Sequence, residues 1–380
     1  MRGRPMDSKT RLLTAWSFKE PDRVPIEIEL YPPMRAFPGA DKIIEFQEKE
    51  ADNFIGVPGF SWGFLGLDSE YREETVEDIP GSCKLIKRTH STPAGEFTAL
   101  TRHFYGEMDP NDYHWEKRYL ETPEDFKRLA EAPRSRRRFD AEQYRLGCER
   151  VGRRGLPCTG LFHPLGSLVR NSNMDEVYVW LLSEKKTTEG FLENCTAQIC
   201  DSMLQLKGME LPDPPIFMTY ALEMLTPPWF GKELFNRLVF PYDKRVNDAV
   251  HLAGGRHRAH CHGNSGDFLE LFADMGIDSV EPLEPSPYGD NVLAEAKKLV
   301  GGRMLLSGNI PSQAFALDSF KARDVRGLVK RAIEEGAPGG GFTLRTSGGA
   351  VGDGKTREQC VKSIECATAL IDAWREFGAY

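Results

Sequence analysis

The stretch HRAHCHGNSGDFLELFADMGIDSVEPLEP, residues 257–285, contains the unit whose repetition decides the fold. It begins with a short strand-like run that a Gly/Asn/Ser junction ends. An amphipathic stretch with apolar residues at helical spacing follows, and then a second strand-like run. This order predicts a strand, a helix and a second strand. Because strands joined through a helix run parallel, the stretch predicts one βαβ unit.

The same alternation continues on both sides of this stretch. The strand-like runs are VPIEIELY (24–31), LPCTGLF (156–162), PIFMTYALE (215–223), HRAHCHG (257–263), SVEPLE (279–284), RMLLSGNI (303–310) and GFTLRTS (341–347). Helices are expected at 174–206, 230–253, 266–275, 291–300, 322–335 and 356–377. Seven visible strands alternating with helices predict an α/β fold, namely a (β/α)8 TIM-type barrel whose remaining strand lies within residues 32–155.

Residues 32–155 differ in composition, being rich in glycine, proline, charged and aromatic residues. They are expected to add strands and helices over one end of the barrel. No clean linker interrupts the chain, so we predict a single domain over residues 1–380, elaborated over about 32–155 and regular over about 156–380. A doubly wound sheet is the main alternative. The absence of a GxGxxG motif after a strand argues against it.

Composition narrows the class of protein. Hydrophobic residues make up 40% and charged residues 28% of the 380, with a net charge of −8. This indicates a globular protein and disfavours nucleic-acid binding, because the one dense basic run, residues 134–138, is short. No run of about 18 apolar residues predicts a membrane span. Eight cysteines without a CxxC motif, and no apolar stretch near the N-terminus, indicate free thiols and a cytoplasmic location.

The histidines of the opening stretch are candidate metal ligands. On a strand His260 and His262 share a face, while Cys261 points the other way. Gly263 and Asn264 end the strand, which places both imidazoles at the C-terminal rim where such barrels keep their chemistry. Two imidazoles form half of a zinc site. The alternative is that both histidines are polar barrel-lining residues bonded to backbone or water.

The next strand offers carboxylate ligands. Glu281 and Glu284 stand at its C-terminal end, and neighbouring parallel strands lie about 4.8 Å apart. Either carboxylate could therefore reach a metal held by the preceding strand. The alternative role for each is to cap or orient a neighbouring loop.

Residues 349–356, GAVGDGKT, satisfy the Walker A pattern, with Lys355 for phosphate and Thr356 for Mg²⁺. Only 24 residues follow Thr356, so no later strand is expected to carry a Walker B aspartate. Thr356 and Gln359 instead predict a capping box at a helix start. Nucleotide hydrolysis is therefore not expected, although a glycine-rich loop at a helix N-terminus can bind an anionic group.

Further polar residues stand at the ends of other predicted strands. The candidates for catalysis are Glu29, His163, Tyr220 and Glu223, and Asn309 is a candidate for substrate contact. Glu29 shares a face with Glu27 and Tyr31, and the alternative is that one of these three pairs with a barrel-lining arginine. His163 precedes a proline, and its alternative role is that of an ordinary rim residue.

Several segments, taken in order, resemble the uroporphyrinogen decarboxylase-like superfamily along nearly the whole chain. They are RLLTAWSFKEPDRVPIEIE (11–29), RTHSTPAGEFTAL (88–100) with its TPxG turn between two strands, HCHGN (260–264), LFADMGIDSVEPLEP (271–285), RMLLSGNI (303–310) and GGGFTLRTSGG (339–349). The resemblance implies an α/β barrel. The superfamily includes decarboxylases of uroporphyrinogen and zinc methyltransferases that move methyl groups between a substrate, a corrinoid and an acceptor.

The chain resembles the methyltransferase branch more closely. True decarboxylases carry an arginine-rich segment after the first strand and a histidine in the last glycine-rich loop, whereas this chain has only Arg35 in the first and no histidine in the second. The methyltransferases bind zinc through HxC and a later cysteine. Here His260 keeps the first position, His262 replaces the cysteine, and Gly349 or a neighbour stands where the second cysteine would lie. Glu284, or else Glu281, is the expected substitute ligand, and Arg35 a substrate contact.

The resemblance therefore implies a zinc-dependent methyltransferase that acts on a small methylated substrate, in the manner of an O-demethylase component. No DxHxxG motif occurs, so a corrinoid would be carried by a separate protein. A decarboxylase or metal hydrolase on the same barrel is one alternative, and a catalytically inactive small-molecule binding protein is another. A homodimer is compatible with the acidic surface.

Overall fold

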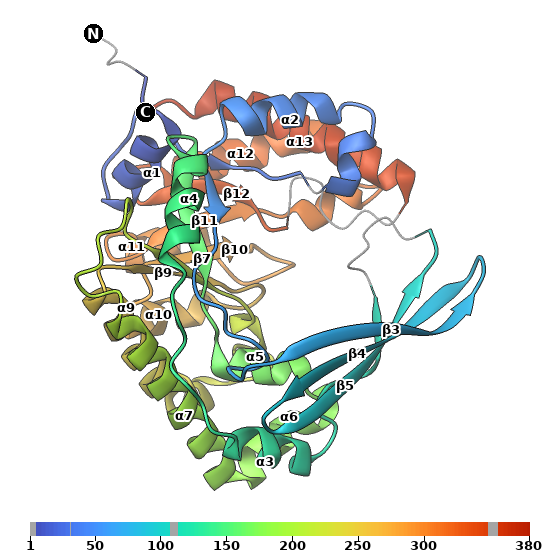
Figure 1. Ribbon diagram of the computed structural model, residues 1–380. Coiled ribbons are helices and arrows are strands. Elements are labelled where there is room, and N and C mark those ends of the chain that lie inside the picture. Colours follow the sequence, from blue (N-terminus) through green and yellow to red (C-terminus); the bar gives the residue numbers. More distant parts are fainter. Residues whose placement is uncertain (1–4, 31, 107–112, 349–355) are drawn as a thin grey trace.

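The computed structural model describes residues 5–30, 32–106, 113–348 and 356–380 (Figure 1). Its larger sheet has eight strands in the order β1-β12-β11-β10-β9-β8-β7-β2, and every neighbouring pair is parallel. The strands are β1 (Ile26–Glu27), β2 (Asn53–Gly56), β7 (Gly155–Gly160), β8 (Ile216–Thr219), β9 (Arg256–His260), β10 (Ser279–Leu283), β11 (Leu305–Ile310) and β12 (Phe342–Thr346). The predicted (β/α)8 barrel is confirmed, and the eighth strand is β2.

Helices lie between the strands and around the outside of the sheet (Figure 1). They are α1 (Ser8–Trp16), α2 (Ala40–Lys49), α3 (Pro123–Glu131), α4 (Ala141–Val151), α5 (Pro164–Asn171), α6 (Met174–Ser183), α7 (Lys185–Leu204), α8 (Lys232–Leu238), α9 (Phe240–Leu252), α10 (Leu269–Met275), α11 (Leu293–Val300), α12 (Ala322–Gly336) and α13 (Arg357–Phe377). Short 3-10 turns are η1 (Pro32–Ala36), η2 (Leu222–Leu225), η3 (Gly266–Phe268) and η4 (Ser312–Ala316).

Two of the expected helices are each divided in two. The stretch 174–206 breaks at Glu184, whose φ of −94° and ψ of 52° are not helical, so α6 ends and α7 begins there. The stretch 230–253 breaks at Val239, and Pro241 follows within the first turn of α9. Proline suits a first turn, because an amide there has no partner within the helix. Each of the two segments therefore forms two shorter helices in place of one long helix.

The N-terminal end of the barrel is closed by α1. Its apolar side packs against residues from the barrel strands and forms a small core of its own, which includes Leu12, Ala15, Trp16, Leu156, Ile216 and Leu305. In this fold active sites lie at the opposite, C-terminal end of the barrel.

Side chains close the barrel between β1 and β2. The Asn53 amide accepts from the Ile28 N–H at 3.0 Å and donates to the Ile28 carbonyl at 2.9 Å. Asp52 accepts from the Ile26 N–H at 3.2 Å, and its own N–H donates to the Ile26 carbonyl at 2.7 Å. These bonds replace the regular ladder that the other strand pairs make, because a buried backbone polar group needs a partner.

The elaboration within 32–155 is built around a second sheet. Four antiparallel strands follow the order β3-β4-β5-β6, namely β3 (Glu70–Ile79), β4 (Cys83–Thr92), β5 (Gly95–Phe104) and β6 (His114–Lys117). The turn at Thr92 and Gly95 is the expected TPxG turn, and Gly95 has the positive φ of 94° that favours glycine. The sheet projects to the right of the barrel in Figure 1. No helix among the described residues is long and apolar enough to cross a membrane.

Candidate active site

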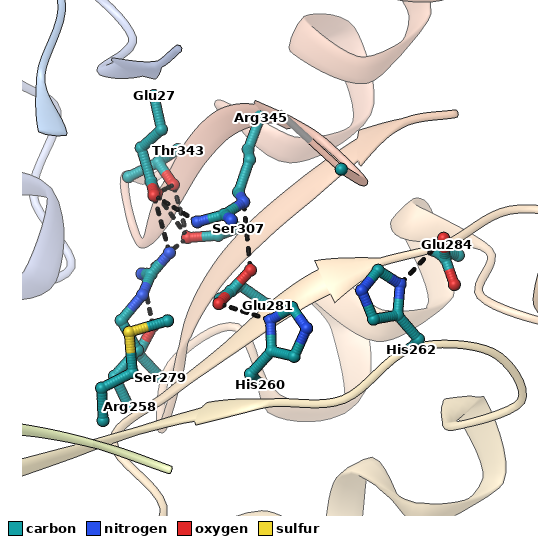
Figure 2. Close-up of polar contacts among 12 residues, drawn as sticks. Glu27, Arg258, His260, His262, Ser279, Glu281, Glu284, Ser307, Thr343 and Arg345 are labelled. Atoms are coloured by element: carbon teal, nitrogen blue, oxygen red, sulfur yellow. Dashed lines mark hydrogen bonds and ion pairs between the residues drawn. The ribbon is translucent and has the colours of Figure 1, made fainter. Parts of the chain in front are cut away.

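The barrel interior holds layers of polar side chains because alternate residues of each strand point inward. One layer contains Arg258, Ser279, Ser307 and Thr343, and the next layer toward the C-terminal end contains His260, Glu281, Asn309 and Arg345. Figure 2 shows how these residues, apart from Asn309, contact one another. The second layer lies at the C-terminal rim of the sheet.

His260 is held by Glu281. The two residues are register partners on β9 and β10, and the His260 Nδ1 lies 2.8 Å from Glu281 Oε1. The other carboxylate oxygen, Oε2, lies 3.0 Å from Arg345 Nε. Burial of Glu281 raises its pKa, but the charges of Arg345 and His260 outweigh burial and hold that pKa far below its usual range. Glu281 is therefore an anion that fixes the ring orientation of His260.

His262 is held in the same way by Glu284. The strand β9 ends at His260, two residues earlier than the expected end, yet the rings of His260 and His262 lie with centroids only 4.5 Å apart. The His262 Nδ1 is 3.1 Å from Glu284 Oε1, and Glu284 Oε2 accepts from the Gly263 N–H at 2.7 Å. Burial opposes the charge on His262, but the bond to Glu284 outweighs it and raises the His262 pKa. Gln313 completes the support by donating to Glu284.

This geometry revises the expected roles of Glu281 and Glu284. Glu284, or else Glu281, was expected as a direct metal ligand, whereas the structure places one carboxylate on the Nδ1 side of each imidazole (Figure 2). A histidine that binds a metal through one ring nitrogen commonly donates its other N–H to a carboxylate. Because the two glutamates occupy the Nδ1 atoms, Nε2 of His260 and Nε2 of His262 are the candidate metal-binding atoms.

The chemical type of these donor atoms suits zinc, since imidazoles oriented by carboxylates are typical zinc ligands. Within the described part of the chain, no group of three or more His, Cys, Asp or Glu side chains is arranged to hold a metal ion. The structure thus supplies two nitrogen donors with their supporting carboxylates, and a zinc ion remains a proposal.

Glu27 organises the layer beneath the histidines. Its carboxylate accepts from Arg258 at 2.7 Å, from Arg345 at 3.0 Å and from the Ser307 hydroxyl at 2.9 Å. Arg258 is fully buried, and its guanidinium lies 4.0 Å above the ring centroid of Phe54. Of Glu27, Glu29 and Tyr31, one of which could pair with a barrel-lining arginine, Glu27 makes such a pair. Arg345 bridges Glu27 and Glu281, which couples this ion-pair layer to the histidines.

Tyr220 and Glu223 border the histidine pair. The Tyr220 ring centroid is 5.4 Å from that of His260, and about half of the Tyr220 side chain is exposed. Glu223 lies in η2, and its Oε2 is buried without a hydrogen-bond partner among the described residues. Its negative charge contributes to raising the pKa of both His262 and His163. A buried carboxylate oxygen without a partner is costly, which indicates a site prepared for a proton, a water or a ligand.

His163 has a structural role that sequence reasoning did not assign. It caps α5, its Nδ1 accepts from the Gly166 N–H at 3.0 Å, and its Nε2 lies 2.8 Å from Asp243 Oδ2. The ring is buried. Because both ring nitrogens already have partners, the geometry favours a positioning role for His163, and the catalytic role expected from the sequence stays a prediction.

The other candidates are less closely connected to the site. Glu29 lies beyond the end of β1 and is exposed, and it makes no hydrogen bond or ion pair with the described residues. Arg35 is exposed on η1, and Asn309 is half-buried on β11 beside Arg345. Their expected roles stay predictions. Of the Walker-like stretch, residues 349–355 lie outside the described residues, while Thr356 and Gln359 form the predicted capping box of α13.

Three supporting residues were missed from the sequence, namely Arg258, Arg345 and Gln313. Strand alternation carries a signal for two of them. Arg258 lies two residues before His260, and Arg345 lies two residues after the inward-facing Thr343. Gln313 lies in η4, where no such periodicity applies.

Comparison with known proteins shows the fold. No protein-family model and no curated protein matches the sequence. Among solved structures, the chain is similar to a methyltransferase from Methanosarcina mazei, with 14% identity over 98% of this chain and 99% of that one and a TM-score of 0.58. It also matches a B12-independent methionine synthase from Shewanella sp. W3-18-1, with 11% identity over 94% and 95% of the two chains and a TM-score of 0.40, a likeness too weak to support an argument. The first likeness covers both chains almost completely and shows a common barrel fold.

Proposed function

We propose that the chain is a methyltransferase of the uroporphyrinogen decarboxylase-like superfamily, which moves a methyl group from a small methylated substrate to a corrinoid carried by a partner protein. The observation that carries the proposal is the histidine pair at the barrel rim, with each Nδ1 held by a buried carboxylate. The likeness to the Methanosarcina mazei methyltransferase supports it through the fold alone.

His260 and His262 would hold a zinc ion through their Nε2 atoms. Bound there, zinc supplies a Lewis acid that stabilises negative charge on a substrate atom. Glu281 and Glu284 keep both rings oriented and fix the tautomer in which Nε2 is free to bind a metal. Arg345 and Gln313 hold these carboxylates in turn.

For a methyl ether, the transfer breaks the O–CH₃ bond and forms a Co–CH₃ bond. The bonding pair stays on the ether oxygen, and Co(I) supplies the two electrons of the new bond. The oxygen anion then takes up a proton. Glu223 is suited to hold that proton at Oε2, because this atom is buried and has no hydrogen-bond partner among the described residues. Tyr220, packed against His260, forms a wall that helps to exclude water.

The test is methyl transfer from a panel of methyl ethers to free cob(I)alamin, followed by the visible absorbance of the cobalt centre. We expect transfer with the native chain and with His251→Ala, a control histidine that is 40% exposed on α9. We expect no transfer with His260→Ala or His262→Ala. Equal rates in all four proteins would contradict the proposal.

A metal hydrolase is the second candidate, because the buried carboxylate of Glu223 beside two imidazoles also suits the activation of water. The same assay separates the two functions. Release of methanol from an ether without corrinoid would indicate hydrolysis, whereas corrinoid-dependent loss of the methyl group indicates transfer.

A further inference from the structure

A cavity of about 320 Å³ opens at the C-terminal ends of β7 and β8, beside the histidine pair. One part of its lining is apolar or aromatic and comes from Leu161, Ala221 and Tyr220. Tyr220 also packs against His260, with ring centroids 5.4 Å apart. Tyr220 therefore separates the cavity from the histidine pair on one side. A small molecule bound in the cavity would lie next to the proposed reactive centre.

The rest of the lining comes from α5 and carries positive charge. Ser167, Arg170 and Asn171 lie on this side, and among the described lining residues there is no aspartate or glutamate. The guanidinium of Arg170 is exposed and makes no hydrogen bond or ion pair with another described residue. Of the other titratable residues of the lining, His163 is paired with Asp243, and burial raises the pKa of Tyr220, which keeps its hydroxyl uncharged. Arg170 is thus a cation that a ligand can neutralise.

A second guanidinium lies next to Arg170. Arg118 donates to the Arg170 carbonyl at 2.8 Å and lies 4.4 Å above the ring centroid of Trp115. Burial lowers the pKa of Arg118, and the positive charge of Arg170 adds to this effect. An anion bound at Arg170 would offset the unfavourable interaction between the two positive charges.

Most charges on the opposite side of the site already have partners. Glu281 contacts His260 and Arg345, and Glu284 contacts His262. Arg170 lines the cavity without a described partner, so an anionic group is attracted to it. The charge distribution therefore orients a ligand that has one anionic end and one uncharged end.

We infer that the cavity binds a small monoanionic carboxylate, with the carboxylate on Arg170 and the apolar body against Tyr220 and Leu161. Guanidinium groups pair with carboxylates through two parallel hydrogen bonds, which fixes both position and direction. The uncharged end then points toward His260 and His262. Resting on the proposed function, this assigns the substrate class: a methylated compound with a carboxylate at the end remote from its methyl group.

The test is calorimetric binding of 4-methoxybenzoate and of its neutral analogue 4-methoxybenzamide at one ionic strength, without corrinoid. We expect the native chain to bind the acid at least about tenfold more tightly than the amide, as a charge-assisted pair implies. Arg170→Gln should bind both compounds equally. Arg323→Gln, which removes an 86% exposed arginine on α12, should keep the native preference.

Equal affinity of the native chain for acid and amide, or no binding of either, would overturn the inference, as would a preference that survives Arg170→Gln. Thermal unfolding of each variant shows whether it is folded, and Ser167→Ala gives a second, milder change in the same cavity. The outcome is separable from that of the proposed function. Preferential binding of the acid without methyl transfer would leave the carboxylate site intact and reject the transferase, whereas transfer from neutral ethers alone would do the reverse.

Discussion

Glu281 connects two sets of interactions that would otherwise be separate. One of its oxygens contacts His260 and the other contacts Arg345, which also binds Glu27. A carboxylate in this position sets both the orientation of the imidazole and its strength as a ligand. The reactivity of the histidine pair therefore depends on a residue that need not touch the substrate.

We predict that Glu281→Gln weakens zinc binding by about 10- to 100-fold, because the amide keeps the shape of the carboxylate but loses its charge. Competition with a chromogenic chelator measures the affinity. Glu270→Gln, an exposed change on α10, is the matched control and should leave the affinity unchanged. Unaltered zinc affinity in Glu281→Gln would show that Glu281 does not support the site.

His257 makes a second prediction at the level of single residues, one that concerns stability. The ring is buried, its Nδ1 lies 2.6 Å from Asn247 Oδ1 and its Nε2 lies 2.8 Å from Thr219 Oγ1. Burial lowers the pKa of His257 from 6.5 to about 4. Between these pH values the unfolded chain binds more protons than the folded one, so the free energy of unfolding falls as the pH is lowered.

For the single group this loss is about 2 kcal/mol between pH 6.5 and pH 5. His257→Gln lacks the titrating ring, so its free energy of unfolding should fall less over this range by about that amount. Urea denaturation at a series of pH values measures the difference. Parallel pH dependence of the native chain and the variant would reject the assignment.

At the level of elements, the start of α13 tests how local sequence signals stabilise a helix. Thr356 accepts from the Gln359 N–H at 3.2 Å, and Gln359 accepts from the Thr356 N–H at 3.1 Å. We predict that Thr356→Ala lowers the free energy of unfolding by about 1 kcal/mol, while Thr356→Ser, which keeps the hydroxyl, changes it little. Urea denaturation of the native chain and of both variants measures these changes in the free energy of unfolding. Equal stability of the alanine and serine variants would show that the cap contributes nothing.

Elements with a strong periodic signal were predictable. The seven predicted strands follow from apolar alternation, and the capping box follows from local hydrogen-bonding residues. The structure contains all seven strands and the capping box. β2 was expected only somewhere within 32–155, because it is four residues long and none of them is fully buried, so no apolar alternation reveals it. The breaks at Glu184 and Val239 interrupt stretches that each read as one helix, although Pro241 carried a local signal for the second break.

The candidate site was predictable in position but not in detail. The sequence placed His260, His262 and the two glutamates at adjoining strand ends, because neighbouring parallel strands bring such residues together. The sequence does not determine whether a carboxylate binds a metal directly or contacts the Nδ1 of an imidazole, since that depends on side-chain rotamers. Gln313 and the cap made by His163 depend on loop geometry that periodicity does not encode.

At the level of the whole molecule, the side-chain amide of Asn53 contributes to closure of the barrel. Asn53 makes two hydrogen bonds to the backbone of Ile28 across the junction of β1 and β2. We predict that Asn53→Ala lowers the free energy of unfolding by about 2 to 4 kcal/mol, because a donor and an acceptor lose their partners. Asn236→Ala, an exposed change on α8, should alter stability by less than about 0.5 kcal/mol. Similar denaturation midpoints for the two variants would contradict the role given to Asn53.

His260 and His262 lie at the C-terminal end of the barrel, and the proposed function depends on these two residues binding a metal. The measurement that tests this most directly is zinc content by plasma mass spectrometry of untagged native chain, His260→Ala and His262→Ala, each expressed with added zinc. We predict near one zinc per native chain and loss of zinc in both variants. No zinc in the native chain, or full retention in either variant, would contradict it.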